Sequence, residues 1–128
     1  MRKEDVMKIA VTSQGPGIES EVDARFGRAR YFVVMDPETG AFRAMDNAQN
    51  LNASQGAGVQ AARTVCEADV EAVVTGNVGP KAFRALVSAG VRVYTGATGT
   101  VAQAVAAFKA GTLEEAGGAN VEGHWGGA

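Results

Sequence analysis

Three short segments of small and hydroxyl-bearing residues offer backbone amides to a ligand. They are Thr12-Ser-Gln-Gly15, Thr75-Gly-Asn-Val-Gly79 and Thr95-Gly-Ala-Thr-Gly-Thr100. Each follows an apolar run typical of a buried strand, and the last two precede segments with helical spacing. The unpaired N–H groups at the start of a helix favour anions. The segments therefore indicate an anion-binding pocket, although glycine-rich turns between strands and helices also occur for geometric reasons alone.

Three arginines follow the first of these segments. Arg25, Arg28 and Arg30 would add positive potential to the pocket if they reach the same edge of the sheet. The interpretation that the sequence favours is a solvated arginine run balanced by the acidic residues of Glu19–Asp23, because most exposed ion pairs contribute little. Phe26, which stands between the arginines, is interpreted as a core anchor and not as a stacking platform.

The residues that most enzymes need are scarce. None of the three segments has the Lys-Ser/Thr ending of a P-loop, and Gly15-Pro-Gly17 does not make a dinucleotide-binding turn. The single histidine, His124, lies in a glycine-rich tail, which argues against a Ser/His/Asp set, and the single cysteine, Cys66, excludes a site built from several thiolates. A small-molecule enzyme is the weakest hypothesis, because no general acid or base is evident. We expect a protein that is not an enzyme.

The overall composition is that of one globular domain. The chain has 128 residues, 46% of them hydrophobic, and 14 acidic against 12 basic residues give a formal net charge of −2. This balance argues against general nucleic-acid or membrane binding. The lone cysteine and the lack of a long apolar run indicate a reduced protein without an anchor. We expect a cytoplasmic monomer.

The apolar pattern predicts the elements that must position these segments. Strands are predicted at 8–13, 31–36, 41–46, 72–75 and 91–94, with Pro37–Gly40 as the hairpin turn between the second and third. Helical spacing follows at Val59–Ala68, from Pro80 to Gly90, where Phe83, Leu86 and Val87 form one face, and from Val101 to Gly111. The fold class is therefore α/β, a single domain with a mixed five-stranded sheet flanked by helices.

The two ends of the chain are set apart from this domain. Residues 1–7 are predicted to be an N-terminal extension, 8–113 the domain, and 114–128 a flexible glycine-rich tail. His124, beside Trp125 in that tail, could supply one metal ligand, but the pattern favours a passive tail. Cys66 is in step with the apolar positions of its helix and is interpreted as a small buried hydrophobe.

Four segments resemble the dinitrogenase iron–molybdenum cofactor biosynthesis family. They are Ile9-Ala-Val-Thr12, Arg25-Phe-Gly-Arg-Ala-Arg-Tyr-Phe32, Asn50 through Gly56-Ala-Gly-Val-Gln-Ala-Ala62, and Val73-Val-Thr-Gly-Asn-Val-Gly-Pro-Lys-Ala-Phe83. The most specific parts are Thr75–Phe83 and Ala89-Gly-Val-Arg-Val-Tyr94. The resemblance covers about 8–113 and is greatest to the stand-alone branch that includes the orange protein of sulfate-reducing bacteria.

This resemblance implies a ribonuclease H-like mixed sheet and a noncatalytic role. Family members carry or store metal–sulfur cofactor precursors, and the stand-alone branch holds a mixed molybdenum–copper sulfide cluster noncovalently. An anionic cluster that brings its own sulfides requires amides, hydroxyls and guanidinium groups more than thiolates. The implied function is a carrier for a molybdenum-containing metal–sulfide cluster, either Mo–Cu sulfide or a nitrogenase-type iron–sulfur cofactor precursor.

The predicted cradle for the cluster consists of four loops, 13–17, 50–58, 76–80 and 95–100. Its predicted cofactor-binding residues are Ser13, Gly15, Arg25, Asn50, Ser54, Gln55, Gly56, Gly58, Gly76, Asn77, Gly79, Thr95, Gly96, Gly99 and Thr100. No protein ligand to a metal is predicted, and the histidine that some relatives place before the first long helix is missing from Ser54–Gly58. The alternative function is a regulatory module that binds a cluster-assembly or cell-division ATPase at the same edge.

Overall fold

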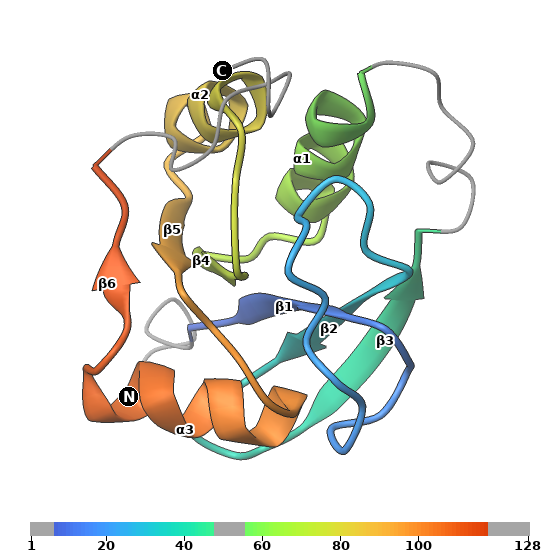
Figure 1. Ribbon diagram of the computed structural model, residues 1–128, viewed down its shortest axis with the longest axis vertical. Coiled ribbons are helices and arrows are strands. Elements are labelled where there is room, and N and C mark those ends of the chain that lie inside the picture. The colour runs from blue at the N-terminus through green and yellow to red at the C-terminus, as the bar shows by residue number, and fades with distance from the viewer. Residues whose placement is uncertain (1–6, 48–55, 118–128) are drawn as a thin grey trace.

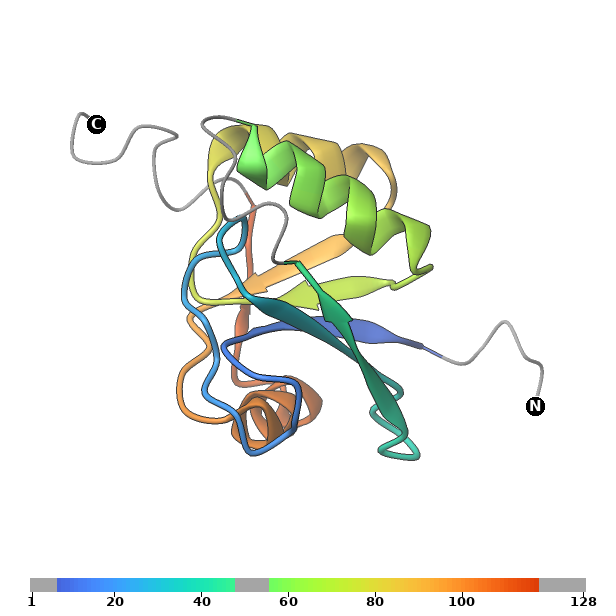
Figure 2. The same cartoon turned by 90° about the vertical axis from the view of Figure 1, so that its right-hand side faces the viewer.

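In the computed structural model, residues 7–47 and 56–117 are described, and they form one sheet with helices on both faces (Figures 1 and 2). The elements in chain order are β1 (Ile9–Ser13), β2 (Tyr31–Met35), β3 (Phe42–Asp46), α1 (Ala57–Glu67), β4 (Ala72–Val74), α2 (Pro80–Ser88), β5 (Arg92–Thr95), α3 (Val101–Ala110) and β6 (Glu114–Glu115). The five predicted strands and three predicted helices are confirmed. Among the described residues, no helix is long and apolar enough to cross a membrane.

The sheet is mixed, with the strand order β3-β2-β1-β4-β5-β6. The β1–β4 and β4–β5 pairs are parallel, and the other three pairs are antiparallel. Because β3 is antiparallel to β2, and β2 to β1, the carboxyl ends of β1, β3, β4 and β5 lie at one edge. Helices α1 and α2 pack on one face of the sheet and α3 on the other (Figure 2). Each of these helices begins at that carboxyl edge.

The sixth strand corrects the predicted five-stranded sheet. Glu114 and Glu115 are exposed acidic residues with no apolar signal, so the sequence pattern predicts that they belong to the tail. They pair with Thr95 and Tyr94 because α3 ends at Gly111, whose φ of 77° returns the chain alongside β5. The rest of the predicted tail from residue 118, with His124 and Trp125, lies outside the described residues, as do residues 1–6 of the predicted extension.

Two apolar layers hold the helices against the sheet. On the α1/α2 face, Phe32, Val65 and Leu86 are fully buried, and on the α3 face Ile9 and Val101 are. The alternation of strand side chains divides the buried residues between the two faces. Full burial of one such side chain contributes about 1.5–3 kcal/mol. The core therefore fixes where each helix begins relative to the sheet edge.

Helix α2 departs from its predicted face at one position. Ala82 and Leu86 are buried against α1 and the sheet, and Phe83 is half-buried. Val87, predicted to share this face, is 50% exposed, because it lies about 100° further round the helix than Leu86. The predicted helix start at Pro80 is confirmed, and Gly90, with a φ of 83°, follows the helix end.

Candidate functional site

Three segments far apart in the sequence meet at the carboxyl edge on the α1/α2 side. A Cβ added to Gly27 would lie 2.8 Å from the Cα of Gly58 in the first turn of α1. A Cβ on Gly58 would lie 3.1 Å from Ala82 in α2, and one on Gly76 would lie 2.8 Å from the Cα of Ala24. Backbones approach this closely only where a side chain is missing. The loop after β1 and the starts of α1 and α2 therefore form one packed unit.

The segment after β1 crosses the carboxyl edge from the α3 face to the α1/α2 face. It makes isolated bridges to the main chain at three places: Ser13 with Val22, Thr100 with Glu21, and Asn77 with Arg25. The amide of Asn77 donates to the Ala24 carbonyl at 2.7 Å. The chain thus covers with its own backbone the crevice where open α/β sheets commonly bind ligands. A ligand could therefore approach this segment from its α1/α2 side.

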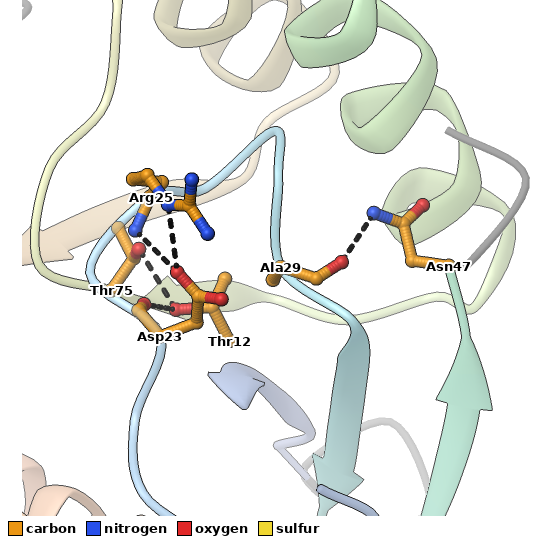
Figure 3. A network of polar contacts seen from close by, with 6 residues as sticks. All are labelled: Thr12, Asp23, Arg25, Ala29, Asn47 and Thr75. Atoms are coloured by element: carbon orange, nitrogen blue, oxygen red, sulfur yellow. Dashed lines mark hydrogen bonds and ion pairs between the residues drawn. The ribbon is translucent and has the colours of Figure 1, made fainter. Parts of the chain in front are cut away.

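A buried polar network attaches this segment to the sheet (Figure 3). The Thr12 hydroxyl donates to the Asp23 carbonyl at 2.6 Å and is hydrogen-bonded to the Thr75 hydroxyl at 2.9 Å. The Asp23 amide donates to the Thr12 carbonyl at 3.0 Å. Asn47 Nδ2 donates to the Ala29 carbonyl at 2.7 Å, which holds the end of the segment. The ends of β1 and β4 therefore set the position of residue 23.

Asp23 and Arg25 form an ion pair in which the aspartate is buried and the arginine is exposed to solvent. Asp23 Oδ1 accepts from the Arg25 amide at 3.0 Å and from its Nε at 3.4 Å. The aspartate side chain is 8% exposed and the arginine side chain 67%. This corrects the interpretation of Asp23 as a solvated neighbour of the arginines, because Asp23 belongs to the buried network and Arg25 extends from it.

The other basic residues of this edge differ in environment. The Arg30 guanidinium lies 5.4 Å from the centroid of the Tyr31 ring, so it makes a cation–π contact. Arg28 is half-buried, and its amide donates to the Arg25 carbonyl. Lys81 is exposed in the first turn of α2. Arg25 and Arg30 are exposed, as the interpretation of a solvated run expects, and Arg28 is half-buried. Arg25 and Lys81 are exposed cations next to the two helix starts.

The first turns of α1 and α2 have no capping side chain. Their N-caps are Gly56, with a φ of 79°, and Gly79, and neither first turn contains an acidic residue. A glycine N-cap leaves the first amides of a helix without the usual side-chain acceptor. Each helix also carries a partial positive charge at its start, equivalent to roughly half an elementary charge. Both features favour an anion beside Gly56–Gly58 and Gly79–Lys81.

The first turn of α3 is capped from within the protein. Thr100 and Gln103 form a capping box, in which the Gln103 amide donates to Thr100 Oγ1 at 3.1 Å and the Thr100 amide to Gln103 Oε1 at 2.9 Å. The amides of Val101 and Ala102 donate to the carbonyls of Ser20 and Ile18, both at 2.9 Å. This helix start therefore has its amides already bonded.

The structure divides the predicted cofactor-binding residues into three groups. It brings together Arg25, Gly56, Gly58, Gly76, Asn77 and Gly79 on the α1/α2 side. It places Ser13, Gly15, Thr95, Gly96, Gly99 and Thr100 on the α3 side, where the Gly15 amide donates to Ser13 Oγ and the Gly96 amide to the Gly76 carbonyl. Asn50, Ser54 and Gln55 lie outside the described residues.

Five residues of the site are not among the predicted cofactor-binding residues: Thr12, Asp23, Gly27, Thr75 and Lys81. The aspartate two residues before Arg25 was a usable signal, because Asp side chains often accept from the amide two positions on. The two threonines open two of the candidate segments, but no local pattern predicts that their hydroxyls bond to each other. Their contact joins residues 63 positions apart.

The donor set suits an anion that supplies its own metal ligands. Among the described residues, no group of three or more His, Cys, Asp or Glu could hold a metal ion. Cys66 is half-buried at the far end of α1, about 12 Å along the helix from Gly58. Burial raises the pKa of its thiol, and the neighbouring Glu67 charge raises it further. The interpretation of Cys66 as a buried hydrophobe is confirmed in part.

The α3 side has a hollow without charge. A shallow cavity of about 500 Å³ lies between Gly96–Gly99, Gln103 and Leu113, and no charged side chain lines it. The amides of its loop are largely bonded within the protein. This cavity therefore offers no charge to an anionic ligand, which is favoured instead beside the exposed cations of the α1/α2 side.

The sequence and the fold of this chain are similar to those of known proteins. The family described as dinitrogenase iron-molybdenum cofactor matches residues 7–111. The apo form of the orange protein from Desulfovibrio gigas is 44% identical, with a TM-score of 0.87, over 90% of this chain and 97% of that one. A putative NifB protein from Thermotoga is 37% identical, with a TM-score of 0.75, over 85% of this chain and 92% of that one. An uncharacterized protein of Methanocaldococcus jannaschii is 28% identical over 115 residues, which are 88% of this chain and 94% of that protein.

Proposed function

This chain belongs to the dinitrogenase iron–molybdenum cofactor family, and on that premise we propose that it is a noncatalytic carrier of a molybdenum-containing metal–sulfide cluster. The cluster is a mixed Mo–Cu sulfide or a nitrogenase-type cofactor precursor, bound noncovalently at the carboxyl edge of the sheet. The observation that carries this proposal is the meeting of two glycine-capped helix starts with the exposed cations Arg25 and Lys81.

The cluster is held by hydrogen bonds and charge. Each helix start contributes about 0.3–1 kcal/mol to the binding free energy of an anion at the surface. The Arg25 guanidinium and the Lys81 ammonium add charge-assisted hydrogen bonds. The sulfide atoms of such a cluster act as acceptors for these N–H groups. No protein thiolate is required, which agrees with the position of Cys66 at the far end of α1.

The chemistry of the site supports carrying and not conversion. Asp23 is the acidic side chain within reach of Arg25, and it already accepts from the Arg25 amide and Nε. A carboxylate engaged in this way is a poor general base. The residues therefore bind and orient the cluster, and they shield one side of it from solvent with the backbone of 23–28.

The remaining parts of the proposal follow the family. The strand order β3-β2-β1-β4-β5, with β2 antiparallel to both neighbours, supports a ribonuclease H-like sheet to which β6 is added. We propose a cytoplasmic monomer.

The alternative function is a module that binds a cluster-assembly or cell-division ATPase. A pull-down on metal-free protein tests it, and stoichiometric recovery of such an ATPase would favour it.

Anaerobic reconstitution tests the proposed function. The purified chain is incubated with tetrathiomolybdate and copper(I), passed through gel filtration, and analysed for metals and visible absorbance. We expect molybdenum to co-elute with the protein in a fixed ratio, and high salt to weaken retention because exposed charges are screened. A chain that keeps its fold by circular dichroism and retains no molybdenum would contradict the proposal.

A further inference from the structure

Asp23 has a role that neither the family nor the sequence assigned to it. We propose that Asp23 is a positioning residue, which holds the Arg25 guanidinium so that its terminal nitrogens face the bound anion. This inference rests on the proposed function, since it concerns the same site. It is carried by the buried carboxylate, by its two bonds to one arginine, and by the scaffold that fixes it (Figure 3).

The burial of Asp23 requires an explanation. An ionised carboxylate is costly to remove from water unless it is paired and hydrogen-bonded. Asp23 is 6% exposed, and the bonds of its carboxylate run to the amide and the Nε of Arg25. Its negative charge, on the same edge as two helix starts, would weaken anion binding if it were not neutralised. The pairing with Arg25 removes that conflict.

The geometry of the pair leaves part of the guanidinium for a ligand. Asp23 Oδ1 bonds to Nε, the nitrogen nearest the side-chain stem. Within 7–47 and 56–117 the polar contacts of the Arg25 side chain involve Nε alone, and Figure 3 shows no contact between the two terminal nitrogens and the other residues drawn. A guanidinium presents five N–H donors in a rigid fork. One edge therefore serves as the anchor and the rest remains for the anion.

The anchor is itself fixed by the end of β1 and by the loop that follows β4. Thr12 at the end of β1 bonds both the amide and the carbonyl of Asp23. The Ala24 carbonyl accepts from the Asn77 amide, and the Phe26 amide donates to the Asn77 carbonyl at 3.2 Å. A long, exposed side chain normally loses much conformational freedom when it binds a ligand, and preorganisation lowers that cost. Arg25 is preorganised through Asp23 in this way.

A double-mutant cycle tests whether Asp23 acts through Arg25. Tetrathiomolybdate affinity is measured by titration for wild type, Asp23→Asn, Arg25→Ala and the double variant. Asparagine keeps an oxygen for the Arg25 amide and removes the charge that holds Nε. We expect Asp23→Asn to weaken binding about fivefold in the wild-type background and to have no further effect beside Arg25→Ala. No loss in the wild-type background, or an equal loss in both, would overturn the inference.

A second measurement on the metal-free protein separates this inference from the proposed function. The Arg25 Nε–H proton is observed by nitrogen-15 NMR, with Arg25→Lys to assign its signal. We expect a distinct, slowly exchanging signal in wild type that is averaged with solvent-exposed arginines in Asp23→Asn. If wild type binds no thiomolybdate, the proposed function fails and this signal alone decides whether Asp23 anchors Arg25. An averaged Arg25 signal in wild type overturns the anchoring.

Discussion

The helix starts on the two faces of the sheet differ in what their first amides bind. On one face, α1 and α2 begin at Gly56 and Gly79, which have no side chain to accept from those amides. On the other face, α3 begins with a Thr100–Gln103 capping box, and carbonyls of the segment after β1 take the next two amides. Helices α2 and α3 nevertheless both follow a glycine-containing turn after a parallel strand, β4 and β5 respectively.

This difference means that a glycine-rich turn is not enough to mark an anion site, because the amides that follow it can already be bonded within the protein, as they are in α3. The segment after β1 produces this difference. Its Ile18 and Ser20 carbonyls accept from the first amides of α3, and its Arg25 lies on the other face. The same stretch of chain therefore closes one candidate site and supplies the cation of the other. Four predictions separate the two faces.

The largest effect is expected from Gly27→Ala. The new Cβ would meet the backbone of Gly58 at 2.8 Å and push the first turn of α1 away from the loop. We expect a loss of about 1–3 kcal/mol in the free energy of unfolding and loss of molybdenum retention. Urea denaturation and reconstitution measure the two. Gly117→Ala is the matched control, because nothing lies within 4 Å of its Cβ. Retention by Gly27→Ala at the level of this control would show that the packed unit is not the site.

The next effect is expected from Lys81→Gln in the first turn of α2. Removal of this charge beside a helix start should lower thiomolybdate affinity about three- to tenfold and reduce the salt dependence of binding. Lys109→Gln, in the last turn of α3, is the control on the other face and should leave the affinity unchanged. Equal losses in the two variants would mean that overall charge, and not the α2 start, attracts the anion.

Thr100→Ala is expected to produce the opposite pattern. The variant loses the acceptor for the Gln103 amide, which should cost about 1 kcal/mol of stability. Thermal denaturation measures this cost, and titration with thiomolybdate should give the wild-type affinity. If Thr100→Ala weakened binding as much as Lys81→Gln does, the α3 start would have to be counted within the site.

The smallest effect is expected at Cys66, which is remote from both faces' helix starts. Cys66→Ala should retain molybdenum as wild type does. Because burial raises the pKa of the thiol, the folded chain holds this proton more tightly than the unfolded chain. The stabilisation is present below the ordinary pKa of a thiol and is lost as the pH rises through the raised value. Alkylation by iodoacetamide near pH 8 should be slower in the folded protein than in urea, and an equal rate would contradict this assignment.

Local patterns in the sequence are enough to predict most of the strands and helices, and the edge of the sheet at which the helices begin. Apolar runs predict β1 to β5, Pro80 the start of α2 and Gly111 the end of α3, because each signal acts over a few neighbouring residues. The family resemblance was also visible in contiguous segments. Strand β6 was missed because its two glutamates pair through the return of the chain and not through their own pattern.

The difference between the side-chain-capped start of α3 and the glycine-capped starts of α1 and α2 required the folded chain. The acceptors for the α3 amides lie some eighty residues earlier in the sequence, at Ile18 and Ser20, and the Thr12–Thr75 contact spans 63 positions. No local pattern encodes such partners, because hydrogen bonds between distant segments depend on where the core places the strands. The burial of Asp23 and the anchoring of Arg25 follow from the same long-range contacts.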